Sequence, residues 1–142
     1  MLLDAQALFS DDQAITATAA STNYINFGDV VTPPGAPAAL NRDYGGAQNI
    51  PLLIQVTEAF DNLTSLTVAV QVDDNPSFSS PTTVVSETVL LANLVAGKKI
   101  PPFNIPLETN EQYMRLYYTV TGTAPTAGAI TAGIAGGLQT NG

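Results

Sequence analysis

Two stretches of strict alternation near the middle of the chain constrain its fold more than any other feature. Every second residue is apolar from Ile50 to Val56, and again from Leu66 to Val72. Successive side chains of a β-strand point to opposite faces, so each stretch predicts a strand with one buried face. A third strand, rich in β-branched residues, is expected over 82–91. The three strands in series predict the centre of an antiparallel sheet.

Weaker strand patterns flank this centre. Strands are expected over 22–27 and over 113–121, and the latter is expected to form a terminal hairpin with 129–134. Residues 98–107 include three prolines, which cannot donate to a sheet ladder, so this segment is expected to be an edge strand or an extended crossing. About seven or eight short strands without a convincing helix predict an all-β fold, a single antiparallel β-sandwich of jelly-roll-like type.

The first twenty residues form a segment of their own. We expect an N-terminal arm over 1–20 and a β-sandwich domain over 21–142, because large apolar side chains precede the first strand. Two interpretations stay open for Leu8 and Phe9, which either tuck into the domain's own core or lie on a neighbouring subunit. We expect the arm to serve assembly more than folding. Its apolar side chains, all candidate partner contacts, are Leu2, Leu3, Leu8 and Phe9.

A long Pro/Gly-rich loop is expected over 29–49, because its prolines and glycines exclude a long helix or a central strand. A loop of this length in a compact domain is uncommon unless it binds something or is pinned by a partner. Arg and Tyr are enriched among interface anchors, so Arg42 and Tyr44 are candidate contacts. An Arg42–Asp43 surface pair is the alternative. Tyr113 and Tyr117, on the second face of their strand, are further candidates.

The composition favours a chain whose surface is covered by partners. Of its 142 residues, 45% are hydrophobic, and only 11% are charged, against about 25% in typical globular proteins. The surface must therefore consist mainly of uncharged polar and small apolar residues. Charged residues are depleted at the centres of protein interfaces, which suits this pattern. Extracellular β-sandwiches, which are also Thr-rich and poor in charge, are the alternative.

Charge and residue types exclude several functions. A net charge of −8 with four basic residues provides no basic stripe for nucleic acid. It also disfavours an anionic membrane surface, and no apolar run approaches the roughly 20 residues of a spanning helix. The chain has no cysteine and no histidine, which removes disulfides, thiol and imidazole catalysis and the usual zinc, copper and iron sites. We expect a protein that is not an enzyme and needs no cofactor. Its N-terminus has no secretory signal, so we expect synthesis in a cytoplasm.

Two acidic features have a functional and a plain interpretation. Asp73-Asp74-Asn75 offers three side-chain oxygens, but calcium needs six or more ligands, so a simple turn is favoured. A glycosidase needs two carboxylates facing each other across a cleft, and the sequence gives no means of pairing the chain's acids in that way.

Three stretches carry a resemblance to a known family. They are LDAQALFSDDQAITATAASTN at 3–23, LTSLTVAVQVDDN at 63–75 followed by FSSP at 78–81, and YMRLYYTVTGTAPTAG at 113–128; LQTNG at 138–142 adds to them. The chain is similar in these stretches to the Bbp16-type capsid cement proteins of tailed bacteriophages. The resemblance implies a jelly-roll-like sandwich that decorates the outer surface of a phage head and clamps neighbouring capsomers of the major capsid protein. It implies no catalytic residues.

The physical features agree with this resemblance. A phage head holds a dense polyanion, so an acidic protein without a basic patch belongs outside the shell. Symmetric association into a dimer or trimer on a capsid axis would let one unit grip several capsomers. The main alternative function is a carbohydrate- or receptor-binding module of a virion, which should display exposed aromatic platforms.

Overall fold

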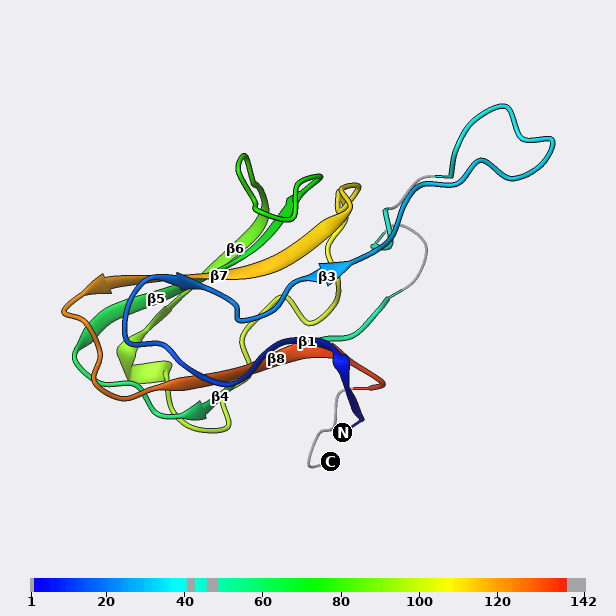
Figure 1. The fold of residues 1–142 in the computed structure, drawn as a ribbon. Helices are drawn as coiled ribbons and strands as arrows, with labels where there is room; N and C mark the ends of the chain where they lie inside the picture. The colour runs from blue at the N-terminus through cyan, green and yellow to red at the C-terminus, as the bar shows by residue number, and fades with distance from the viewer. Residues whose placement is uncertain (1, 41–42, 46–48, 138–142) are drawn as a thin grey trace.

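The computed structural model describes residues 2–40, 43–45 and 49–137, and within them the strands form two antiparallel sheets stacked face to face (Figure 1). The smaller sheet has the order β1-β8-β4, and the larger has the order β2-β7-β5-β6, with β3 also paired to β7. The all-β sandwich predicted from the sequence is confirmed. The elements are β1 (Leu3–Ala14), β2 (Ala19–Ala20), β3 (Ile25–Asn26), β4 (Leu52–Glu58), β5 (Leu63–Asp73), β6 (Thr82–Leu90), the 3-10 turn η1 (Leu91–Asn93), β7 (Tyr113–Gly122) and β8 (Ala129–Ala135).

The core lies between the sheets, where the alternating residues meet. In β4 the side chains of Leu52, Ile54 and Val56 are fully buried. In β5 every second residue from Leu66 to Val72 is buried in the same core, as the sequence predicts. The inner face of β7 adds Met114, Leu116 and Tyr118, which are also fully buried. Burying each large apolar side chain contributes about 1.5–3 kcal/mol, so this double layer is the main source of stability.

The predicted pairing of the central strands is wrong in one respect. β5 does pair with β6, but its other neighbour is β7, and β4 belongs to the opposite sheet, where it pairs with β8. The residues between β4 and β5 therefore carry the chain from one sheet to the other. Asn62 in this corner has a φ of +61°, a left-handed conformation that Asn tolerates better than most residues.

The predicted terminal hairpin of β7 and β8 is also wrong, because these strands lie in different sheets. The loop between them is held by Asp61, whose carboxylate accepts hydrogen bonds from the backbone N–H groups of Thr126 and Ala127 and from the Thr126 hydroxyl. These bonds lower the pKa of Asp61 below its ordinary value, led by the Thr126 hydroxyl. A side chain at Gly128 would place its Cβ 2.3 Å from the Phe60 ring, so glycine is required there.

The N-terminal segment belongs to the sandwich. β1 pairs with β8 from Leu3 opposite Ala135 to Ala14 opposite Ala129. The division into an arm over 1–20 and a domain over 21–142 therefore does not describe residues 3–14, because their backbone is hydrogen-bonded into the smaller sheet. Beyond β1 the chain crosses to β2 on the larger sheet.

Residues 98–105 form the extended crossing that was one of the two alternatives for this segment. Backbone hydrogen bonds attach it to the free side of β4, with Lys98 O accepting from Val56 N and Ile54 O accepting from Ile100 N. Isolated bridges at Pro51–Asn104 and Gln55–Lys99 continue the contact. The crossing covers the edge of β4, so that edge is not open to another strand.

The long loop after β3 projects away from the sandwich (Figure 1). We call its described outer part, residues 28–40, the finger. None of these residues is buried, and the finger extends well beyond both sheets. In the part of the chain that the structure describes, no helix is long and apolar enough to cross a membrane.

Candidate partner-binding surface

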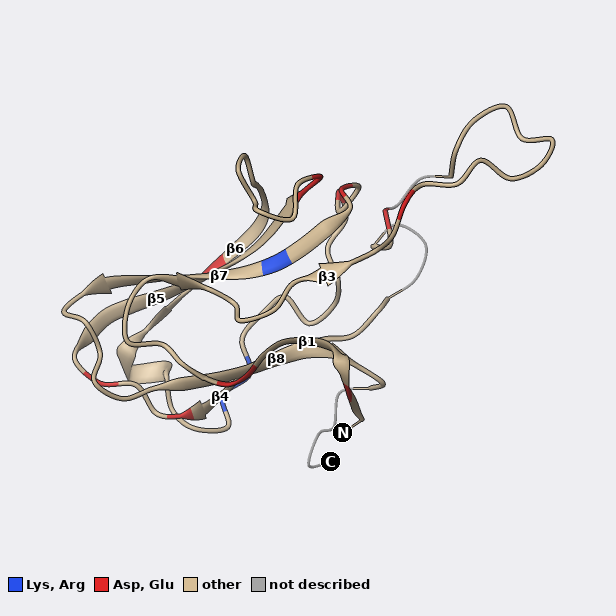
Figure 2. Ribbon diagram, in the orientation of Figure 1, with Lys and Arg blue, Asp and Glu red and all other residues tan. Residues whose placement is uncertain are grey.

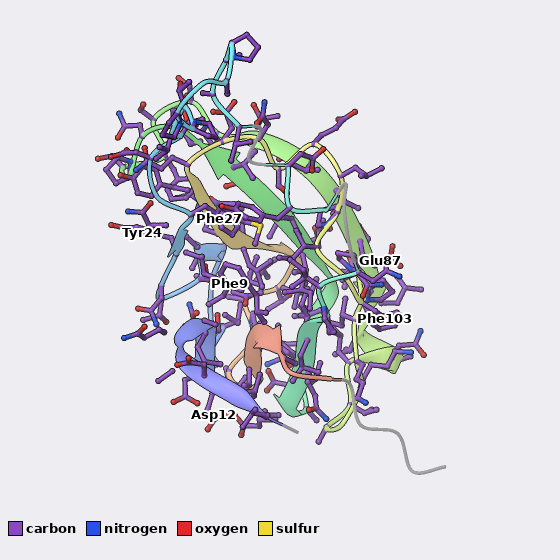
Figure 3. All side chains as sticks on the ribbon, turned by 90° about the vertical axis from the view of Figure 1, so that its right-hand side faces the viewer. Phe9, Asp12, Tyr24, Phe27, Glu87 and Phe103 are labelled. Carbon is purple, nitrogen blue, oxygen red and sulfur yellow. The ribbon has the colours of Figure 1, made fainter. Side chains whose placement is uncertain are left out.

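The structure separates the four apolar residues of the N-terminal segment. Leu2 is 78% exposed, whereas the side chain of Phe9 is fully buried in the chain's own core. Figure 3 shows Phe9 pointing into the space between the sheets. Leu3 and Leu8 are half-buried, and Leu8 lies over Gly133, where an added Cβ would come within 2.9 Å of it. The prediction that Phe9 contacts a partner is therefore wrong, because core residues of the same chain cover its side chain. Leu2 remains accessible to a partner.

The two candidates in the long loop have different outcomes. Arg42 lies outside the described residues. Tyr44 is 39% exposed and packs on Phe27, with 4.7 Å between ring centroids. Its hydroxyl donates a hydrogen bond to the Phe27 carbonyl at 3.4 Å. Next to it, a Cβ on Gly45 would lie 2.1 Å from the Pro106 carbonyl oxygen, so glycine lets the loop backbone approach the sandwich closely.

Tyr113 and Tyr117 are brought together with residues from other elements. Both lie on the outer face of β7, flanking Arg115, while Met114, Leu116 and Tyr118 face the core. Tyr24 packs edge-on against Tyr113 at 5.5 Å and against Phe78 at 6.0 Å. Figure 3 shows the Tyr24 side chain at the outer flank of the molecule. We call this group the aromatic patch; its members are Tyr24, Phe78, Tyr113, Arg115 and Tyr117.

Arg115 is the centre of the aromatic patch. Its guanidinium carbon lies 4.2 Å from the Phe78 ring centroid and 5.4 Å from that of Tyr117, both within cation–π range. Its Nε donates a hydrogen bond of 2.9 Å to Gln71 Oε1 on β5. Partial burial lowers the pKa of Arg115, although Tyr117 and Asp73 oppose the shift. An arginine stays charged despite such a shift, so the patch contains a cation whose position is set by Gln71, Phe78 and Tyr117.

Phe78 reaches Arg115 because of the turn between β5 and β6. The Asp73 carboxylate accepts hydrogen bonds from the backbone N–H groups of Asn75 and Ser80, and Asn75 Oδ1 accepts one from Ser77 N–H. Asp73 and Asn75, two of the three residues that raised the calcium alternative, thus use their oxygens within the turn, whereas Asp74 Oδ1 accepts a hydrogen bond from Gln112 N–H. Among the described residues, no group of three or more acidic side chains is placed to hold a metal ion. Phe78 itself has a φ of +49° and is almost fully buried.

The aromatic patch is suited to binding. It has a fixed cation, aromatic rings and Tyr hydroxyls, which are the groups that dominate protein interfaces. Sequence reasoning found Tyr113 and Tyr117 but missed Arg115, Tyr24 and Phe78 as partners. Alternation in β7 already placed Arg115 on the face of both tyrosines, and that signal was enough to find it. No sequence signal links Tyr24 or Phe78 to β7, because turns and tertiary packing bring them there.

Comparison with models of known protein families identifies a family that this chain resembles. The Bbp16 family model matches residues 9–134, which is most of the chain. No curated protein matches it. The matched range includes every residue of the aromatic patch and the whole finger.

Proposed function

The chain belongs to the phage-associated Bbp16 family, and from this membership and the aromatic patch we propose that it is a capsid cement protein. The family points to a structural protein of a phage. In our proposal the protein binds the outer surface of the head and clamps adjacent capsomers of the major capsid protein. It acts by binding, without a cofactor or catalytic step, and it is made in the host cytoplasm before it joins the virion.

The observation that carries this proposal is the aromatic patch. Arg115 is held between Phe78 and Tyr117 and bonded to Gln71, so its position is set before any partner arrives. Tyr24, at 48% exposure, offers apolar surface beside it. Side chains that are already ordered lose less entropy on binding, and Arg and Tyr are the residue types whose truncation commonly costs about 2 kcal/mol or more.

The distribution of charge favours the outside of a shell. Figure 2 shows the acidic residues spread over both sheets and their loops, with few basic residues between them. The net charge of −8 would oppose contact with packed DNA inside the head. A capsid protein that faces this surface must tolerate or complement negative charge.

Cementing follows from binding across a seam. A bound copy adds its own contact free energy to the work of separating two capsomers. Standard interfaces bury about 1,200–2,000 Å². Even a few kcal/mol per copy resists opening when it is repeated over the lattice, and a dimer or trimer on a symmetry axis would engage several capsomers together.

A carbohydrate- or receptor-binding role is the second candidate, favoured by the exposed Tyr24 ring beside Arg115. Sugars stack on flat aromatic faces, whereas Tyr24 and Tyr113 meet at an interplanar angle of 83°. The two rings therefore do not form a coplanar platform, and we favour a protein partner.

The test is binding of purified protein to expanded, undecorated heads. Wild type is expected to bind at saturable, symmetric positions and to raise the temperature at which heads rupture. Arg115→Gln and Tyr24→Ala are each expected to weaken binding about tenfold or more, equivalent to about 1.4 kcal/mol. Glu87→Gln on β6 is the control.

Two outcomes would contradict the proposal. The first is absence of saturable binding by wild type. The second is glycan-array binding that depends on Tyr24 with no affinity for heads, which would support the carbohydrate-binding role instead.

A further inference from the structure

The finger exposes large apolar side chains that the fold does not need. Val31 is 65% exposed, Leu40 is 64% exposed and Val30 is 40% exposed. None of them belongs to the core or packs against it. Exposed apolar side chains contribute favourable free energy only when another surface covers them and removes them from water.

The finger is preorganised. Its tip is a β-turn in which Pro33 O accepts a hydrogen bond of 3.0 Å from Ala36 N–H, with Pro34 and Gly35 at the central positions. Gly35 has a φ of +84°, which the third position of a type II turn requires, and proline fixes the position before it. Leu40 N–H donates to Val31 O at 3.3 Å and closes the two legs. A loop restrained in this way loses little conformational entropy when it binds.

The base of the finger is fixed to the sandwich. Phe27 N–H donates to Gln112 O at 2.9 Å, and the Phe27 ring packs on Tyr44. Gly28 N–H donates to the side chain of Asn26 in β3. The finger therefore leaves the sandwich in a set direction, which is visible in Figure 1.

The finger is almost uncharged, whereas the residues around its base are acidic. Within residues 28–40 the charged side chain is Asp29, at the base, and the remainder is uncharged. Figure 2 shows acidic residues around this base. Five acidic residues lie on the finger base and on the segments that hydrogen bonds join near it, and we call them the acidic collar: Asp29, Asp43, Asp74, Glu108 and Glu111. Glu108 N–H donates to Asp43 Oδ2, and Gln112 N–H donates to Asp74 Oδ1, so these segments are adjacent.

We propose that the finger inserts into an apolar, uncharged socket on a protein of different sequence, whose rim is basic and faces the acidic collar. This inference rests on the proposed function, in which that protein is a subunit of the shell. Charge argues against a second copy as the partner, because this chain has four basic residues against twelve acidic ones and cannot supply such a rim. The apolar contact supplies affinity that is insensitive to salt, and the collar supplies orientation and a faster approach.

The experiment compares two variants with matched controls in binding to undecorated heads at low and high salt. Val31→Asp with Leu40→Asp changes the finger, and Leu90→Asp with Val95→Asp changes exposed apolar residues at the opposite end of the sandwich. Asp29→Asn with Glu108→Gln changes the collar, and Asp11→Asn with Glu87→Gln removes the same charge elsewhere. A deletion of residues 32–39, which joins the hydrogen-bonded Val31 and Leu40, is a second finger variant.

The finger variants are expected to lose at least tenfold in affinity at both salt concentrations, with an unchanged melting temperature. The collar variant is expected to bind less tightly at low salt and to respond less to added salt than wild type. Both control pairs are expected to bind like wild type.

Three outcomes would overturn the inference. If wild type binds heads and the finger variants bind equally well, the binding role of the finger is refuted and the proposed function is left intact. Failure of wild type to bind heads refutes both. Self-association of wild type that the finger variants abolish assigns the finger to a second copy.

Discussion

Replacing Phe9 with alanine tests the role of the N-terminal strand most directly. The Phe9 side chain is fully buried between the sheets, among core residues from both. A Phe→Ala change in a core costs about 3–5 kcal/mol, from lost burial and from the cavity that remains. For a chain of 142 residues, total stability is about 7–20 kcal/mol. One side chain from the segment expected to be an arm would thus account for a large share of it.

The magnitude translates into a measurable shift. With an unfolding entropy of about 2.1 cal/mol/K per residue, a loss of 3–5 kcal/mol lowers the melting temperature by about 10–17 °C. Scanning calorimetry and urea unfolding monitored by tyrosine fluorescence measure it independently. Leu2→Ala, at a position 78% exposed, is the control, and it is expected to change stability by less than about 0.5 kcal/mol.

Deletion of residues 1–12 extends the same test. If residues 1–20 were an arm that serves assembly more than folding, as the sequence predicts, the deletion would leave a soluble domain with nearly unchanged unfolding. The structure predicts the opposite, because the deletion removes Phe9, most of β1 and the Ser10–Tyr118 hydrogen bond. A Phe9→Ala protein within about 1 kcal/mol of wild type would show that β1 does not pack in solution as described.

Two further predictions concern the core. Burial raises the pKa of Tyr118 above the ordinary tyrosine value of 10.0, against the opposing hydrogen bond with Ser10. Above about pH 10 the unfolded chain therefore loses this proton while the folded chain keeps it, and the free energy of unfolding falls with rising pH. Tyr118→Phe is expected to flatten that fall in urea titrations, and an identical alkaline decline in both proteins would contradict the assignment. Val68→Asp buries an unpaired charge between the sheets and is expected to give insoluble protein. The control, Thr67→Asp on the outer face of β5, is expected to stay folded. If both variants had equal solubility and equal melting temperatures, the faces of β5 would be misassigned.

The sequence determined which face of each strand is buried. A period of two identifies the inner residues of β4, β5 and β7 whatever strands lie beside them, because it depends only on backbone geometry. It also placed Arg115 with Tyr113 and Tyr117, and Pro34-Gly35 specified the turn at the tip of the finger. These features are local, so a few neighbouring residues decide them.

Only the tertiary structure decided which strands pair and which surfaces meet. The alternation of apolar residues in β4 is the same whether that strand pairs with β5 or with β8. The loop that leads β8 to the other sheet is held by hydrogen bonds between Asp61 and residues 65 and 66 positions later in the sequence. Ser10 and Tyr118, 108 residues apart, join the two sheets and place the N-terminal segment in the core. Phe78 reaches Arg115, and Tyr24 reaches Phe78 and Tyr113, through turns whose directions no periodicity encodes. Such contacts depend on the whole packed chain, because each becomes favourable only after distant segments have already been brought together.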